Sequence, residues 1–166
     1  MKKIEIKAKI SIISLILLLT ISAIFVALPT ASAQTTQKSY PYIGTVPNPV
    51  GINQQVLLHV GITAALSSAE MGWEGLTVTV TRPDGQTETL GPFRTDSTGG
   101  TGTLYTPTMV GTYTLQTNFP EQTVTLTPFF SPFPVERTFL AGSSEPFELV
   151  VQDDPIPYYP GHELPT

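Results

Sequence analysis

After residue 33, apolar side chains recur at every second position, and no stretch repeats them every 3.6 residues. The clearest example is the segment 76–81, in which Leu and Val alternate with Thr. Period two with β-branched residues on both faces is typical of a pleated strand. Pro-Asp-Gly at 83–85 then favours a tight turn. The segment 76–90 is therefore predicted to be a β-hairpin.

The same alternation appears in three further segments, 56–62, 112–119 and 147–151, and shorter strands are expected at 103–106 and 124–126. Ser, Thr, Gly and Asp at 95–102 indicate a turn, because no P-loop lysine follows these glycines. This pattern predicts an all-β fold, an immunoglobulin-like antiparallel β-sandwich of about seven strands.

One segment, 106–113, resembles the corner of immunoglobulin-like sandwiches. In those domains a tyrosine that opens a late strand bonds back to the backbone a few residues upstream. Tyr113 is expected to take this structural role.

The first 33 residues have the order of a secretory signal. Four lysines come first, an apolar stretch runs over 10–28, and Ala31-Ser32-Ala33 comes last. This order predicts a signal-peptide helix that is cleaved between Ala33 and Gln34. The alternative is an uncleaved anchor, because this mainly apolar stretch spans 19 residues, which is long enough to cross a bilayer. Either way the protein is expected to be secreted or at the cell surface.

The remaining chain is expected to hold one domain. Residues 34–45 are polar and predict a linker, and 46–152 are assigned to the sandwich. Residues 153–166 are rich in proline, which predicts an extended tail or linker.

The charge balance argues against one class of partner. Four of the eight basic residues and one of the 13 acidic residues lie in the first 33, so the rest carries a net charge of −8. No Lys/Arg cluster is present after residue 33, and nucleic acid is therefore not expected to bind. Membrane contact is expected only through an uncleaved signal segment.

Side chains suited to catalysis are few. The chain has no cysteine, which excludes thiol catalysis and Cys-ligated zinc. His59 is expected on the solvent side of a strand, and His162 has only Glu163 close in sequence. Calcium at Asp153 and Asp154 is an open alternative, but no loop shows an alternating acidic pattern. No enzyme activity, metal or cofactor is expected.

Four aromatic residues are candidates for an interface. Phe129, Phe130 and Phe133 lie in a segment interrupted by prolines. One short strand cannot bury all three of these side chains. They form either a contact surface or a local packing cluster. Trp73 either stacks on a sugar or a partner, or caps one end of the core, and the core role is favoured.

Several runs together resemble a known family. They are Trp-Glu-Gly-Leu at 73–76 continuing to the Pro-Asp-Gly turn, Thr-Glu-Thr-Leu-Gly-Pro-Phe at 87–93, and Tyr-Thr-Pro at 105–107 leading to 110–113. They are similar to the amino-terminal immunoglobulin-like region of large secreted archaeal proteins that continue into a pyrroloquinoline-quinone-binding-like β-propeller. The tail 155–166 resembles the junction into that propeller.

This resemblance implies a non-catalytic, propeller-associated module. The chain departs from the family because it contains no propeller, so no cofactor site can be carried over to a residue here. The proline-rich end suggests a fragment of a longer gene product.

The function expected from the sequence is that of an extracellular or cell-surface interaction and spacer module with a protein or glycan partner. One alternative is a carbohydrate-binding accessory domain of an exported enzyme, with Trp73, Tyr158 and Tyr159 as stacking groups. Another is a subunit of a surface lattice or filament.

Overall fold

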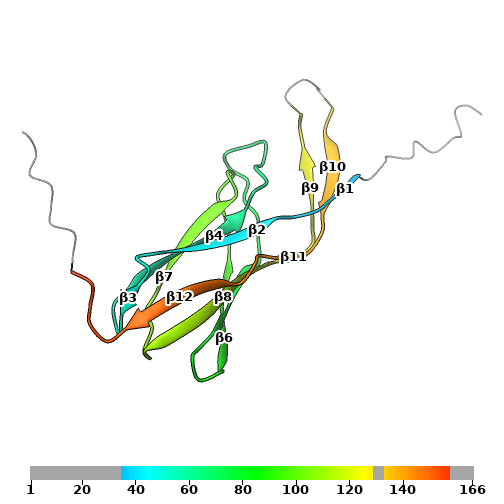
Figure 1. Ribbon diagram of the computed structural model, residues 1–166. Helices are drawn as coiled ribbons and strands as arrows, with labels where there is room; N and C mark the ends of the chain where they lie inside the picture. The colour runs from blue at the N-terminus through cyan, green and yellow to red at the C-terminus, as the bar shows by residue number, and fades with distance from the viewer. Residues whose placement is uncertain (1–34, 129–132, 158–166) are drawn as a thin grey trace, which may run out of the picture. The chain divides into compact units, whose positions relative to one another are not determined.

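The computed structural model in Figure 1 describes residues 35–128 and 133–157. These residues form twelve β-strands and no helix, so the predicted all-β class is confirmed. No helix that could cross a membrane occurs among them. The predicted signal segment 1–33, with its cleavage point between Ala33 and Gln34, lies outside the described residues.

Two sheets face each other. The first has three antiparallel strands in the order β2 (Pro41–Val46), β4 (Val56–Ile62), β7 (Gly100–Tyr105). The second has the order β3 (Val50–Gly51), β12 (Phe147–Gln152), β8 (Gly111–Phe119), β5 (Leu76–Thr81), β6 (Thr87–Phe93), with β11 (Gly142–Ser143) paired to β8. The second sheet is antiparallel except where β3 pairs with β12.

A third, smaller sheet contains a hairpin that the sequence did not predict as a unit. β9 (Gln122–Leu126) pairs with β10 (Val135–Phe139), and β1 (Thr35–Gln37) adds to β10 in parallel. The β9–β10 hairpin is inserted between β8 and β12, which are direct neighbours in the second sheet (Figure 1).

The core between the two facing sheets follows the predicted alternation. Val78, Leu115 and Leu149 are fully buried, as expected from their strands. They belong to a cluster that both sheets fill, made of Val50, Val56, Leu58, Val60, Val78, Val80, Tyr113, Leu115, Leu149 and Val151. Each large aliphatic side chain buried in this way contributes about 1.5–3 kcal/mol to folding.

A second buried cluster lies beyond the first, around Trp73. The indole packs edge-on against Phe119 at 5.4 Å and Phe139 at 4.6 Å between ring centroids. Its Nε1–H donates to the carbonyl oxygen of Ala64 at 2.6 Å. Leu76 and Ile62 complete the cluster, which therefore joins both facing sheets to the inserted hairpin.

The predicted corner is present at Tyr113. The N–H of Met109 donates to the Tyr113 hydroxyl oxygen at 3.1 Å, four residues upstream. Since Tyr113 is fully buried, this bond supplies an acceptor to a backbone group that water reaches only partly.

Replacing Tyr113 with phenylalanine is expected to lower the free energy of unfolding by about 1–2 kcal/mol, because the Met109 N–H loses its acceptor. Urea unfolding followed by Trp73 fluorescence measures this. Tyr105→Phe is the matched control, since its hydroxyl donates to Glu88 at an exposed position. A larger loss for Tyr105→Phe than for Tyr113→Phe would contradict the structural role of the corner.

The predicted hairpin 76–90 is confirmed, with one difference. Its turn is closed by Arg82 N–H to the Gln86 carbonyl at 2.8 Å, and Gly85 has φ +82°. The partner strand does not end at Gly91-Pro92 as predicted but continues to Phe93. A register shift between Leu76 and Val78 places an extra residue in β6 at this point. Proline is tolerated at this point because β6 is an edge strand and is bulged here.

The predicted linker 34–45 is wrong, because β1 and most of β2 lie within it. β1 is exposed throughout and has no apolar signal, and β2 carries Pro41 and Gly44, so only main-chain pairing reveals either strand. The strand count also exceeds about seven. The additional strands are β1, β3 and β11, which have two or three residues, β2, which was assigned mostly to the linker, and the hairpin strand β10, which follows the proline-rich segment.

Candidate interaction face

The outward side of the three-stranded sheet has an unusual composition. Strand register places nine residues there, named the outer face: Tyr42, Gly44, Val46, Leu57, His59, Gly61, Gly100, Gly102 and Leu104. None of them is an acidic residue, Lys, Arg, Ser, Thr, Asn or Gln. The outward side of the second sheet is instead rich in Thr, Gln and Asn, as solvated sheet faces usually are. The outer face is therefore the candidate site.

One end of the outer face is aliphatic. Val46 lies opposite Leu57, and Leu57 lies opposite Leu104, so the three side chains form a row across all three strands. They are 66%, 43% and 61% exposed. A contiguous apolar row at this exposure is characteristic of a contact surface.

The other end of the outer face is aromatic and flat. A Cβ at Gly61 would lie 2.6 Å from the Tyr42 hydroxyl oxygen, so the tyrosine ring rests directly on this glycine. His59 contacts the same ring edge-on, with centroids 5.6 Å apart. The missing side chain at Gly61 thus lets the ring lie against the sheet.

Asp96 sets the electrostatics beside Tyr42. The carboxylate accepts bonds from the Thr98 hydroxyl at 2.6 Å, the Thr98 N–H at 2.8 Å and the Gly100 N–H at 3.3 Å. These bonds, the Thr98 hydroxyl first, lower the pKa of Asp96 below its usual value. Burial raises the pKa of Tyr42, and the nearby Asp96 charge adds to this, so Tyr42 presents a neutral phenol.

The lowered pKa of Asp96 predicts a pH dependence. Its contribution to stability is present above the ordinary aspartate pKa and is lost as the pH falls through the lower folded-state value. Asp96→Asn is expected to be less stable than wild type at neutral pH and equally stable near pH 2, to be checked by urea midpoints. A difference of the same size at both pH values would contradict the assignment.

An open pocket of ≈ 440 Å³ adjoins the aliphatic end of the outer face. It is lined by Val46, Pro47, Asn53, Gln54, Gln55, Ile156 and Pro157. Gln54 holds the chain here, because its Oε1 accepts from Gly51 N–H at 2.9 Å and Ile156 N–H at 3.0 Å. Its Nε2 donates to the Ile156 carbonyl at 2.9 Å. The segment after β12 is therefore anchored on the sandwich as far as Ile156.

The aromatic residues singled out in the sequence have different outcomes. Trp73 is fully buried, which fits the favoured core role and leaves no ring face for a sugar or a partner. Phe133 is 74% exposed, just before β10. Phe129 and Phe130 lie outside the described residues, as do Tyr158 and Tyr159 of the carbohydrate alternative.

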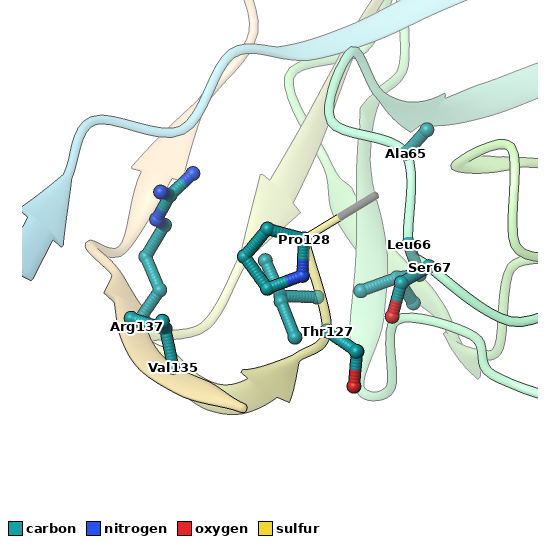
Figure 2. A pocket seen from close by; sticks show the side chains of 8 residues that line it. Ala65, Leu66, Ser67, Thr127, Pro128, Val135 and Arg137 are labelled. Atoms are coloured by element: carbon teal, nitrogen blue, oxygen red, sulfur yellow. The ribbon is translucent and has the colours of Figure 1, made fainter. Parts of the chain in front are cut away.

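A smaller pocket of ≈ 220 Å³ lies between the loop 64–71 and the β9–β10 hairpin. Figure 2 shows Leu66 and Ser67 on one side and Thr127, Pro128 and Val135 on the other. Arg137 also lines this pocket, but its guanidinium donates to Gln37 of β1 at 3.2 Å. The pocket therefore marks the contact between loop and hairpin.

Other polar groups of the described residues have structural partners. Tyr105 donates to Glu88 at 2.7 Å, and burial together with this bond raises its pKa. Among residues 35–128 and 133–157, no group of three or more His, Asp or Glu is placed to hold a metal. Gln152 Nε2 donates to the Asp154 carbonyl at 2.9 Å and so closes the last strand.

Sequence reasoning missed the outer face. His59 was expected on the solvent side of its strand, and it is exposed there, as is Leu57. Tyr42, Gly44 and Val46 were not recognised as its third strand, since β2 was assigned mostly to a linker. The available signal was the lack of polar residues at every second position of 57–61 and 100–104.

Comparisons with protein-family models, with curated proteins and with solved structures found no significant match.

Proposed function

We propose that this chain is a non-catalytic, immunoglobulin-like interaction and spacer module that acts outside the cytoplasm. The strand order β2-β4-β7 facing β12-β8-β5-β6 supports the immunoglobulin-like assignment, because it corresponds to strands A-B-E facing G-F-C-C′. The Met109–Tyr113 bond at the start of β8 is a second point in its favour.

The positions of the chain's described ends support the spacer role. β1 lies beside the β9–β10 hairpin, while the segment after β12 leaves from the opposite end of the sandwich (Figure 1). Gln54 ties that segment to the sandwich through two hydrogen bonds to Ile156, and a third bond, from Gly51 N–H, holds the Gln54 amide in place. A module with its two ends placed in this way holds the chain segments on either side of it apart.

The outer face is the observation that carries the interaction role. It combines the exposed row Val46–Leu57–Leu104 with the flat Tyr42–His59 end, and no charged residue interrupts it. A flat apolar face of this kind suits a protein surface of matching flatness. The sequence resemblance to the propeller proteins implies that the module stands at the amino-terminal side of a secreted β-propeller protein.

The test tracks the full chain, carrying a carboxyl-terminal epitope, in the cells that produce it. External protease is expected to remove the epitope from intact cells or from their medium. Val46→Lys with Leu57→Lys is expected to reduce retention on the cell envelope, whereas Val150→Lys, an exposed aliphatic of the second sheet, is expected to leave it unchanged. An epitope that stays protected until the cells are lysed would overturn the proposal.

A carbohydrate partner is the second candidate, because Tyr42 and His59 place two rings on a flat face. Glycan-array binding that Tyr42→Ala abolishes, and that Val46→Lys leaves intact, would favour it.

A further inference from the structure

β7 is an edge strand with a free outer side. Ile62 N–H donates to the Gly99 carbonyl at 2.9 Å, which fixes the phase of the β4–β7 ladder. Hydrogen-bonded and non-hydrogen-bonded residue pairs alternate along an antiparallel ladder. The backbone N–H and C=O groups of Thr101 and Thr103 therefore bond to β4. The N–H and C=O groups of Gly102 and Leu104 therefore point away from the sheet. No bond between described residues uses these four groups.

The other edges are protected in ways that β7 is not. β6 has the Pro92 bulge and Glu88, and β2 begins at Pro41 and contacts β11 and β12. β9 is tied down at its first residue, Gln122. The Gln122 side-chain amide donates to the Glu74 carbonyl at 2.8 Å and accepts from the Glu74 N–H at 3.0 Å. β1 and β3 have only three and two residues. β7 has six residues without proline, charge or bulge, which is the description of an edge open to pairing.

We propose that two copies of this chain pair antiparallel through β7 and join their three-stranded sheets into one continuous sheet. With Thr103 opposite the partner's Thr103, Gly102 lies opposite the partner's Leu104. The four outward groups of each copy then make four backbone hydrogen bonds across a two-fold axis.

Charge and shape favour a second copy as the occupant. The chain is acidic, with a net charge of −5, so like charges oppose self-association wherever acidic residues meet. β7 contains only Gly, Thr, Leu and Tyr, so its self-pairing brings no two carboxylates into register. The 61% exposed Leu104 of each copy would also cover the partner's Gly102, which has no side chain of its own.

The register gives a sharp test, because the chain has no cysteine. Thr103→Cys is expected to form a disulfide-linked dimer in air, visible on a non-reducing gel. Thr101→Cys is the matched control, since the same register separates the two sulfurs by about 13 Å along the strands. That distance is too long for a disulfide, so this variant is expected to stay monomeric. Cross-linking of Thr101→Cys in preference to Thr103→Cys would overturn the proposal.

Sedimentation of the full chain gives the second test. Wild type is expected to dimerise with rising concentration. Leu104→Pro removes one outward N–H from each copy but no bond to β4, and is expected to weaken association by about tenfold to a hundredfold. Val150→Lys is expected to sediment as wild type. A wild-type chain that stays monomeric at every concentration would overturn the pairing.

The β7 pairing goes beyond the proposed function, and either of the two can be refuted while the other stands. A monomeric protein that external protease still reaches would refute the β7 pairing alone, whereas a dimer that is confined to the cytoplasm would refute the proposed function alone.

Discussion

Trp73→Ala is expected to lower the free energy of unfolding by about 3–5 kcal/mol. The change removes a fully buried ring that contacts Phe119 and Phe139, and it leaves the Ala64 carbonyl without its indole donor. Because Trp73 is the only tryptophan, the variant must be followed by far-ultraviolet circular dichroism in urea rather than by fluorescence.

Trp73→Phe separates packing from hydrogen bonding in this cluster. It keeps an aromatic ring but loses the donor to Ala64, so an intermediate loss is expected. Leu57→Ala, an exposed position on the outer face, is the surface control and should cost less than about 1 kcal/mol. If Trp73→Ala cost no more than Leu57→Ala, the second cluster would not contribute to stability as described.

Gln54→Ala is expected to cost about 1–3 kcal/mol and to release the segment after β12 from the sandwich. The amide satisfies Gly51 N–H, Ile156 N–H and the Ile156 carbonyl, all at partly buried positions. Limited proteolysis with mass spectrometry should therefore show faster cleavage after Gln152 in the variant, while the facing sheets stay intact.

Gln54→Glu is the matched control for this prediction. A carboxylate can still accept from Gly51 and Ile156 but cannot donate to the Ile156 carbonyl, so proteolysis intermediate between wild type and alanine is expected. Gln55→Ala, a neighbouring exposed amide, should leave the cleavage pattern unchanged. Cleavage in Gln54→Ala at the wild-type rate would show that the tail is held by other contacts.

The parts of the fold that could be predicted are those in which burial decides the sequence. Val78, Leu115 and Leu149 alternate with polar residues because one side of each strand faces the core. The Pro-Asp-Gly turn and the Tyr113 corner were visible for a similar reason, since their local geometry restricts the residue type.

The parts that were missed are held by main-chain pairing. β1 is exposed along its length, and β10 directly follows a proline-rich segment, so neither strand leaves a period in the sequence. The outer face was missed because it requires a register. Val46, Leu57 and Leu104 are separated by many residues along the chain, and only the pairing of β2, β4 and β7 brings them into one row.

The pairing of Gly142 and Ser143 with the end of β8 has a consequence for how such a protein can diversify. It brings together the two points at which the chain leaves β8 and returns toward β12. The two ends of the inserted segment therefore stay paired whatever its length. Each doubling of that length adds only about 0.6 kcal/mol to the entropic cost of closing the loop. A foreign segment inserted within this loop, with Phe139 kept against Trp73, would be carried by an unaltered frame.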